Sequence, residues 1–456
     1  MKRLFLIFVI IIAASCSFDN KTGIWKDASN IPADNQDAKS IENNNSKNRY
    51  EDVFIKNQIY GEEKESLNTS SFEIDAPVKS ENWLQQFATS TNNVSNFLYS
   101  GNKTLLSKSS KLSKFSLVKN YSNRNIVFYE DNLITYDHKG TIFIYSLNLN
   151  KKIFEYNFYK KNFKNYKKEI YLIISEDTLY VADNLGYLYA INLLSKSLIW
   201  AKNYGIPFRS NLKVASGQFF LVNQDNVIYS IDINTGDKNW QFATSLTFLK
   251  SDFKNNIALD EVNSNLLFLN TNGELYSISY LNQKINWVLN FKNSSLAGDT
   301  DLFLSQPIVI KNNNLIISTE KAILSYDIIL ASRKWIFPAE LVLKPIATTN
   351  YTYVVTKNDF LICLDSKTGE VVWSKNIYKN LKNKVIKKIG MLYHFKIVNK
   401  ELNLFSKNGY LLSFNHSNGN LNYLKKISKN GISSEIIFVK DNMFLIDNDN
   451  KLLKYN

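Results

Sequence analysis

The sequence predicts an all-β fold, an eight-bladed β-propeller of four-stranded antiparallel blades that a strand from the N-terminal region closes. Three observations predict it: a recurring strand pattern, an aromatic position in constant register, and a last repeat that lacks its final strand. The pattern is marked by Gly186. Equivalent markers are Gly140, Asn226, Gly273, Lys321, Asp359, Gly409 and Asn450. Their spacings run from 38 residues (Lys321 to Asp359) to 50 residues (Asp359 to Gly409), which matches the length of a propeller blade.

Each repeat contains four short runs rich in Val, Ile, Leu and Tyr. Around Gly186 these runs cover residues 169–174, 178–182, 187–191 and 198–202, with polar turns between them. The pattern indicates consecutive antiparallel hairpins and excludes solenoids of helix pairs. Because a sheet of four strands cannot bury both of its faces alone, the repeats must stack on one another, and radial stacking closes a ring.

An aromatic residue lies fourteen positions after each of the first seven markers. These residues are Phe154, Trp200, Trp240, Trp287, Trp335, Trp373 and Tyr423. We expect their rings to fill the gaps between adjacent blades, because a large ring buries much apolar area. Ligand stacking is the alternative role. Three repeats carry a glycine in the last hairpin turn, at Gly236, Gly369 and Gly419, which supplies the positive φ of a tight turn.

The eighth marker is Asn450, and the chain ends six residues later, before the aromatic position of that repeat is reached. We therefore expect the last blade to take its closing strand from upstream of the first repeat. Residues 114–118 are the candidate, because Phe115 lies 39 residues before the first aromatic of the column, Phe154, which is within the observed spacing. The region around Trp83 is the alternative. Joining the two ends in one sheet would remove free strand edges that promote aggregation.

The N-terminus has the pattern of a secretory signal peptide over residues 1–15. Met1-Lys-Arg supplies positive charge, nine apolar residues follow at 4–12, and small residues lead to Cys16. Nine apolar residues are too few to span a bilayer as a helix. The Ala-Ala-Ser-Cys run resembles the lipobox of bacterial lipoproteins, so we expect Cys16 to carry a lipid. An ordinary signal peptide is the alternative. In the bacterial sorting rule that the resemblance implies, Ser17 permits the outer membrane.

Residues 16–110 show poor periodicity and many polar residues. The sequence therefore predicts a lipidated Cys16 and a polar, largely disordered tether there, with the propeller over residues 111–456. The net charge of +14 is interpreted as a Lys-rich soluble surface. A nearby anionic membrane or nucleic acid is the alternative reading of that charge. Of these two partners we expect only the membrane, through the lipid anchor.

No set of residues in the sequence indicates catalysis. The three histidines, His138, His394 and His416, fall in different repeats, and no acidic and histidine cluster has the spacing of a metal site. Cys363 lies in an apolar strand, where a buried and inert thiol is expected. The sequence therefore predicts a protein that is not an enzyme and that holds neither a cofactor nor a metal.

Two hairpins resemble a known repeat signature. They are residues 365–373, Asp-Ser-Lys-Thr-Gly-Glu-Val-Val-Trp, and residues 232–240, Asp-Ile-Asn-Thr-Gly-Asp-Lys-Asn-Trp. Both are similar to the LDxxTGxxxW motif of quinoprotein-type, or PQQ-like, propeller repeats. Pyrroloquinoline quinone (PQQ) dehydrogenases share this motif with the BamB lipoproteins of the outer-membrane β-barrel assembly (BAM) machinery. The dehydrogenases need a quinone at the axis and a calcium site, and they often have a disulfide between adjacent cysteines. This sequence has no adjacent cysteines. The lipobox, the tether and the eight repeats match BamB.

The BamB resemblance implies a scaffold on the periplasmic face of the outer membrane that docks on the periplasmic POTRA domains of the barrel-inserting subunit. It also implies that interblade loops on one face make the contacts. One such loop follows Trp240 and contains Leu246, Phe248, Leu249 and Lys250; another follows Trp287 and contains Asp299 and Asp301. Solvated loops without a docking role are the alternative. Two other functions stay open: a PQQ-dependent dehydrogenase, and a periplasmic propeller that binds another protein or a polysaccharide.

Overall fold

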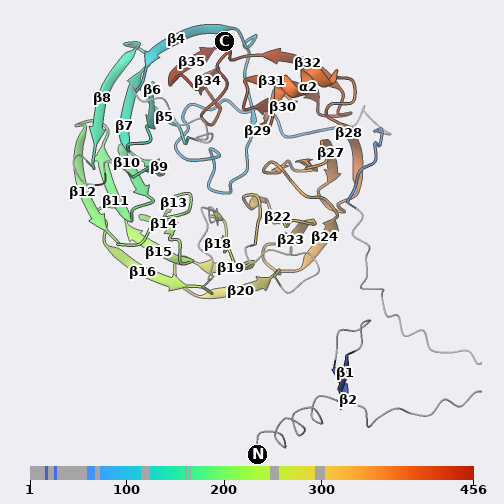
Figure 1. Ribbon diagram of the computed structural model, residues 1–456. Coiled ribbons are helices and arrows are strands. Elements are labelled where there is room, and N and C mark those ends of the chain that lie inside the picture. Colours follow the sequence, from blue (N-terminus) through green and yellow to red (C-terminus); the bar gives the residue numbers. More distant parts are fainter. Residues whose placement is uncertain are drawn as a thin grey trace, which may run out of the picture. The chain divides into compact units, whose positions relative to one another are not determined.

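The computed structural model contains a closed ring of eight blades, which confirms the all-β propeller that the repeats predict (Figure 1). The structure describes residues 16–18, 25–27, 59–66, 72–113, 124–159, 163, 166–246, 256–292 and 303–456. Contacts divide the chain into two units, residues 1–55 and 56–456. In the first, β1 (Cys16–Phe18) pairs antiparallel with β2 (Trp25–Asp27). The second unit holds the propeller.

The blades are numbered 1 to 8 in chain order, and each begins with its innermost strand. Blade 1 comprises β5 (Val127–Tyr129), β6 (Asn132–Tyr136), β7 (Thr141–Ser146) and β8 (Lys151–Asn157), and blade 2 comprises β9 (Ile170–Ser175), β10 (Thr178–Asp183), β11 (Tyr187–Asn192) and β12 (Ser197–Asn203). Blade 3 comprises β13 (Lys213–Ala215), β14 (Gln218–Val222), β15 (Val227–Asp232) and β16 (Lys238–Ala243). Blade 4 comprises β17 (Asn256–Asp260), β18 (Asn265–Leu269), β19 (Glu274–Ser279) and β20 (Ile285–Asn290).

Blades 5 to 8 complete the ring, and the last two include strands from the N-terminal region. Blade 5 comprises β21 (Val309–Lys311), β22 (Asn314–Ser318), β23 (Ile323–Asp327) and β24 (Arg333–Phe337), and blade 6 comprises β25 (Ile346–Ala347), β26 (Tyr351–Val355), β27 (Phe360–Asp365) and β28 (Val371–Asn376). Blade 7 comprises β3 (Asn96–Phe97), β29 (Leu392–Val398), β30 (Glu401–Ser406), β31 (Tyr410–Asn415) and β32 (Leu421–Lys426). Blade 8 comprises β33 (Ile437–Val439), β34 (Asn442–Ile446), β35 (Lys451–Tyr455) and β4 (Leu105–Lys111).

A side-chain hydrogen bond explains why the repeat marker keeps its register. In blade 2, Asp183 Oδ1 accepts the backbone N–H of Tyr187 at 2.8 Å, which closes the turn between the second and third strands around Gly186. The residue three before the marker accepts the equivalent bond in seven blades. In blade 5 the turn is shorter, and the acceptor is Thr319, two residues before Lys321. All markers except Lys321 have positive φ, which Gly, Asn and Asp adopt most readily. The turn therefore fixes the marker.

The aromatic column lies between neighbouring blades. Trp373 is fully buried, and its indole N–H donates to the His416 carbonyl of the next blade at 3.1 Å. Its ring covers Gly419, where an added Cβ would meet the ring at 2.4 Å. The same bond joins three further tryptophans to the next blade's turn. These pairs are Trp200 with Ile233, Trp287 with Ile328, and Trp335 with Ser366. Each of these rings therefore fastens one blade to the next.

An upstream strand closes blade 8, but it is not the one that the aromatic spacing predicts. β4 pairs antiparallel with β35, with Lys111 opposite Lys451 and Lys108 opposite Leu453. The choice of residues 114–118 was therefore wrong; that segment, including Phe115, lies outside the described residues. The physical reason is that backbone pairing, rather than an aromatic side chain, selects the closing strand. In β4 the place of the column aromatic is taken by Ser107, which lies opposite Lys454.

Residues 80–97, which we call the collar, run around the inside of the ring (Figure 1). They bond in chain order to the innermost region of blades 8, 1, 2, 3, 4, 5, 6 and 7. The contacts are Ser80 with Lys440, Trp83 with Phe128, Leu84 with Ile174, Thr89 with Lys213, Ser90 with Leu259, Thr91 with Ile310, Asn93 with Ala347, and Asn96 with Ile397. The Trp83 region therefore packs against the inner strands and does not close blade 8, and residues 72–110 do not form the polar tether that their composition predicts.

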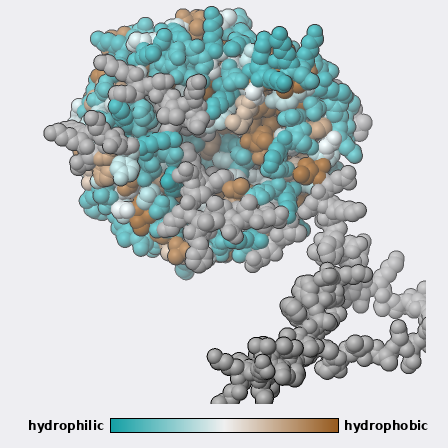
Figure 2. Space-filling model, in the orientation of Figure 1, coloured by the Kyte–Doolittle hydropathy of each residue, from teal (hydrophilic) through white to brown (hydrophobic). Residues whose placement is uncertain are grey.

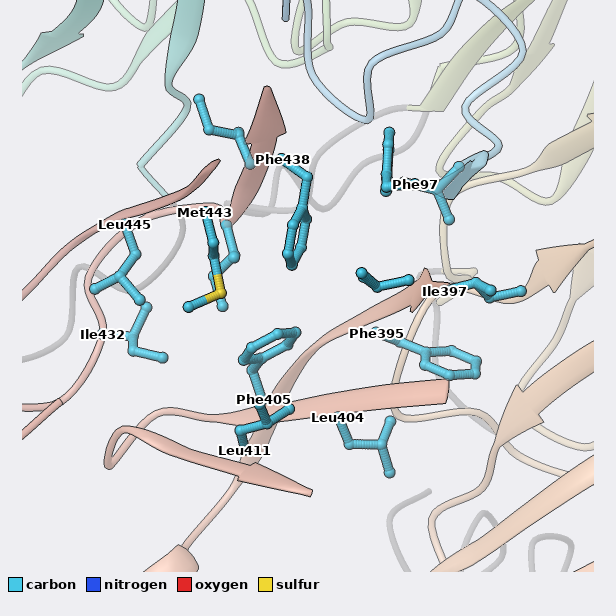
Figure 3. Close-up of a cluster of buried hydrophobic side chains, with 14 of the residues drawn as sticks. Phe97, Phe395, Ile397, Leu404, Phe405, Leu411, Ile432, Phe438, Met443 and Leu445 are labelled. Atoms are coloured by element: carbon cyan, nitrogen blue, oxygen red, sulfur yellow. The ribbon is translucent and has the colours of Figure 1, made fainter. Parts of the chain in front are cut away.

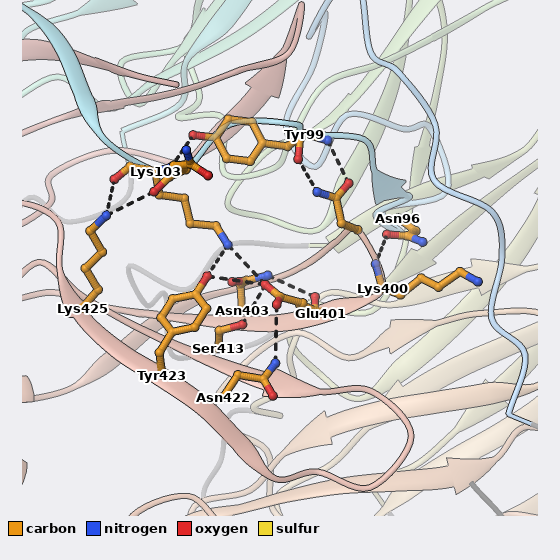
Figure 4. A network of polar contacts seen from close by, with 12 residues as sticks. Asn96, Tyr99, Lys103, Lys400, Glu401, Asn403, Ser413, Asn422, Tyr423 and Lys425 are labelled. Atoms are coloured by element: carbon orange, nitrogen blue, oxygen red, sulfur yellow. Dashed lines mark hydrogen bonds and ion pairs between the residues drawn. The ribbon is translucent and has the colours of Figure 1, made fainter. Parts of the chain in front are cut away.

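Two further groups hold the N-terminal region to blades 7 and 8. Phe97 of β3 joins a buried cluster with Phe395, Phe405 and Phe438 (Figure 3). Beyond β3, Lys103 forms an ion pair with Glu401 at 3.3 Å and also contacts the hydroxyl of Tyr423 (Figure 4). The seventh column aromatic thus contacts the segment that leads into β4. Earlier in the chain, Lys64 pairs with Ser374 at the outer strand β28.

Two glycines with the same backbone angle test the contact between column and turn. Gly419 and Gly217 both have φ of +71°, but an added Cβ meets the Trp373 ring only at Gly419, and nothing lies within 4 Å at Gly217. We expect Gly217→Ala to lower the free energy of unfolding by about 1–2 kcal/mol, the cost of the left-handed conformation. Gly419→Ala should cost a further ~1–3 kcal/mol because the ring must move. Urea unfolding measures both; equal costs would contradict the packing role of Trp373.

Candidate functional site

The two loops predicted to dock emerge from the same end of the ring, which we call the loop face. Every connection from the outer strand of one blade to the inner strand of the next lies at this end, because the strands alternate in direction. Leu246, in the connection from β16 to β17, is 68% exposed. Phe248, Leu249, Lys250, Asp299 and Asp301 lie outside the described residues.

Other connections on the loop face expose large apolar side chains as well. Phe163 and Tyr166, between β8 and β9, contact each other edge to face with ring centroids 6.1 Å apart. Val342, between β24 and β25, and Met391, between β28 and β29, are also exposed. On the molecular surface, apolar patches are separated by hydrophilic stretches (Figure 2). Exposed apolar and aromatic side chains at one end of a molecule are typical of protein docking surfaces.

The loop face also carries positive charge. The connection from β28 to β29 contains a short helix, α2 (Asn383–Ile389), with no acidic residue in its first turn and with Lys387 and Lys388 in its last turn. Lys384 lies on the same helix, and Lys382 precedes it. Of the helix, only Ile389 is buried. Apolar side chains beside lysines suit a partner surface that combines apolar and acidic groups.

The inside of the ring holds buried charge, and the collar supplies part of its surroundings. Lys396 and Glu435 form an ion pair of 3.0 Å with both side chains almost fully buried, and the Lys396 ammonium lies 4.7 Å from the centre of the Trp83 ring. Lys213 donates to the side chain of Gln85 and to the carbonyl of Thr89. Burial lowers the pKa of Lys213 to about 7. The collar therefore takes part in a buried ionic network.

The collar is the feature that sequence analysis missed, although its signal is present. Trp83 and the amide pair Asn92-Asn93 stand in an otherwise polar stretch. Asn92 donates to the carbonyls of Ile257 and Ile308 at 2.9 and 3.1 Å, and Asn93 donates to the carbonyl of Ala347 at 2.7 Å. Two adjacent amides thus bond to the inner strands of three blades. Amide side chains with such partners lie in a folded core. From composition alone, the same side chains would be predicted to face solvent.

The histidines, the cysteine and the acidic residues that the structure describes do not gather into a metal site. Within the described ranges, no three His, Cys, Asp or Glu side chains are placed to share a metal ion. His138 lies in blade 1, but His394 and His416 both lie in blade 7, so the expectation that the three histidines fall in different repeats was wrong. Burial lowers the pKa of His394 to about 3. Cys363 is fully buried, and burial raises the pKa of its thiol, so this residue is a poor nucleophile. In the part of the chain that the structure covers, no helix has the length and apolar character needed to cross a bilayer.

The buried amine of Lys213 predicts how stability changes with pH. Its pKa falls from 10.5 to about 7 on folding, so between these values the folded chain holds a neutral amine and the unfolded chain a charged one. Unfolding then takes up a proton, and stability rises with pH by up to about 1 kcal/mol per pH unit. Lys213→Met should flatten the rise between pH 7 and pH 9, measured by urea unfolding. An unchanged slope would contradict a neutral Lys213.

Comparisons with known proteins agree on the fold. Residues 163–375 match a family model described as "Outer membrane protein assembly factor BamB". Among solved structures, BamB from Moraxella catarrhalis aligns with a TM-score of 0.61 at 14% identity, over 77% of this chain and 99% of that one. No curated protein matches the sequence significantly.

Dehydrogenases of the same repeat type are also similar in structure. A quinohemoprotein alcohol dehydrogenase, ADHIIG from Pseudomonas putida HK5, aligns with a TM-score of 0.56 at 10% identity, over 84% of this chain and 83% of that one. A europium-containing methanol dehydrogenase aligns with a TM-score of 0.56 at 9% identity, over 80% and 89%. Such low identities bear on fold alone. The match over residues 163–375 and the ring of eight blades show that this propeller is similar to BamB and has the fold of PQQ-type propellers.

Proposed function

We propose that this chain is a non-enzymatic scaffold lipoprotein of the BAM complex, which docks on the POTRA domains of the barrel-inserting subunit and aids insertion of outer-membrane proteins. The observation that carries the proposal is the collar. Because residues 80–97 bond to the inner region of all eight blades, the surfaces left for a large partner are the ends and the outer rim of the ring. The matched family model, described as an outer-membrane protein assembly factor, supports the same role.

The loop face is the proposed docking surface. Leu246, Tyr166 and Met391 are exposed there, on connections from three different blades, and α2 adds lysines. A few apolar anchors surrounded by polar groups are sufficient for a specific protein contact. The loop residues Phe248, Leu249, Lys250, Asp299 and Asp301 belong to two of the connections at this end and are proposed as further contacts.

Attachment to the outer membrane is proposed to come from a lipid on Cys16, after removal of residues 1–15. Residues 59–66 already contact the propeller, for example through the Lys64 and Ser374 pair. The connection between lipid and propeller therefore spans at most residues 17–58. A lipid anchor would raise the local concentration of the propeller at the membrane, so that modest loop contacts suffice for docking.

A PQQ-dependent dehydrogenase is the second candidate, because two dehydrogenases have similar folds. The described residues do not fit that cofactor pair. No three His, Cys, Asp or Glu side chains there are placed to share a metal ion such as calcium, and the inner strands, which would face a quinone at the axis, bond to the collar. Adding PQQ and calcium should therefore produce neither dye-linked dehydrogenase activity nor a rise in the thermal midpoint. A saturable rise in either would favour the dehydrogenase. A propeller that binds another periplasmic protein or a polysaccharide is the remaining alternative.

Substitution at the loop face tests the scaffold role. Leu246→Asp places a charge on the proposed docking surface, and the purified lipoprotein should then recover at least tenfold less of the barrel-inserting subunit from outer membranes in mild detergent. Leu281→Asp is the matched control, since Leu281 is 61% exposed in a hairpin turn at the opposite end of the ring. We expect normal recovery with this variant.

The same experiment can reject the proposal. If the unsubstituted protein repeatedly fails to recover the barrel-inserting subunit, the scaffold role is wrong. If Leu281→Asp abolishes recovery and Leu246→Asp does not, the docking surface lies at the other end. Thermal midpoints of both variants should match that of the unsubstituted protein, because both side chains are mainly exposed.

A further inference from the structure

The seam between blades 8 and 1 lacks the ring that the other seams have. In blades 6 and 7 the column aromatic stands opposite a defined residue of the third strand, as Trp373 opposite Cys363 and Tyr423 opposite Ser413. In blade 8 the equivalent third-strand residue is Lys454, and Ser107 of β4 stands opposite it. A register irregularity directly precedes Ser107 on its strand, as one precedes Trp373 and Tyr423 on theirs. Ser107 therefore occupies the aromatic position with a side chain too short to reach the next blade.

A pocket of about 180 Å³ lies at this seam. Blade 8 contributes Ser107, Leu452 and Lys454 to its lining, and blade 1 contributes Tyr145, Leu147 and Asn150. Its volume is below the roughly 300–1,000 Å³ typical of small-molecule sites, and it suits a single side chain better than a cofactor. Leu452 and Tyr145 are almost fully buried and provide an apolar floor.

The walls of the pocket repeat the groups that hold tryptophans elsewhere. Leu147 stands seven residues after its marker, at the position of the carbonyls that accept the indole N–H groups of Trp200, Trp287, Trp335 and Trp373. Asn150 has φ of +49°, and it occupies the same position in the hairpin turn of blade 1 as Gly419 does in the turn of blade 7. A glycine is not required at that position, because Trp287 bonds across a turn that has Ala331 there.

We propose that this seam binds an aromatic side chain, preferentially tryptophan, that a partner polypeptide presents. Four tryptophans of this chain show how an indole is held against the equivalent turn, with its N–H on a backbone carbonyl. Lys454 adds a cation at the wall, which favours an aromatic face. Leu106 and Leu149, next to the lining residues Ser107 and Asn150, are more than half exposed. They give a partner chain apolar contacts beside the pocket.

A free tryptophan derivative tests the site without any assumption about the partner. We would titrate the full-length protein with N-acetyl-5-fluorotryptophanamide and follow the fluorine resonance by NMR. Saturable binding is expected, and N-acetylleucinamide should bind at least tenfold more weakly. Ser107→Trp should fill the seam from within and weaken binding of the probe at least tenfold, whereas Ser107→Ala should leave it unchanged. The result stands apart from the scaffold role, because the barrel-inserting subunit is absent.

Two further variants keep the test valid if Ser107→Trp does not fold. Asn150→Gly gives the turn the glycine found beside Trp373 and should strengthen binding severalfold. Phe154→Ala empties the equivalent position between blades 1 and 2, where the ring is only partly buried, and should add a second binding site. Absence of binding to the unsubstituted protein would overturn the proposal. Binding that appears only with Phe115→Ala would also overturn it, because the chain's own ring would then be the occupant.

Discussion

The propeller depends on the contact between the outer strand of one blade and the hairpin turn of the next. A blade has two faces to bury, and at the outer strand the column aromatic covers the gap to the next blade. Trp373 does so by packing its ring on Gly419 and donating its N–H to the carbonyl of His416. The contact unites an apolar surface with a satisfied polar group, as buried tryptophans require. Because each contact joins only neighbours, the ring gains its cooperativity when the last blade meets the first.

Closure comes from the N-terminal region, which contributes to the propeller in three ways. β4 completes the sheet of blade 8, β3 adds a fifth strand to blade 7, and the collar bonds to the inner region of every blade. Inner strands in a ring leave backbone groups facing the axis, and buried groups of this kind are costly unless they are paired. Trp83 exchanges two backbone hydrogen bonds of 2.8 Å with Phe128, and such bonds supply partners where water would otherwise be needed.

Much of the ring could be predicted from the sequence, because its signals are local. The marker register reflects one turn with a side-chain hydrogen bond, which has the same spacing in seven blades. In blade 5 the acceptor, Thr319, lies one residue closer to the marker. The aromatic column likewise reflects a contact repeated at a fixed distance along the chain. Because several repeats share the pattern, one irregular copy does not hide it. Lys321 lacks positive φ, yet its aromatic, Trp335, still follows fourteen residues later.

The N-terminal region could not be predicted in the same way, because its structure comes from contacts with residues of other blades that lie far away in the sequence. Polar composition over residues 72–110 indicates a tether, yet Asn92 finds carbonyls at Ile257 and Ile308. The spacing of the aromatic column predicts Phe115 in the closing strand, but that strand has Ser107 at the column position. For the docking surface, the sequence pointed to two loops, of which the structure describes Leu246.

Net charge is a poor guide to the partner of this protein, because part of the charge is inside the ring. Lys396 is paired with Glu435 in the core, and the pKa of Lys213 is lowered to about 7, so neither lysine presents a full positive charge to solvent near neutral pH. The lysines on α2 differ, since of that helix only Ile389 is buried. A partner on the proposed docking surface would therefore meet positive charge on the connections of the loop face, next to apolar side chains such as Met391. Recognition there would depend on where charged and apolar groups are placed, and the net charge of +14 of the whole chain adds little to it.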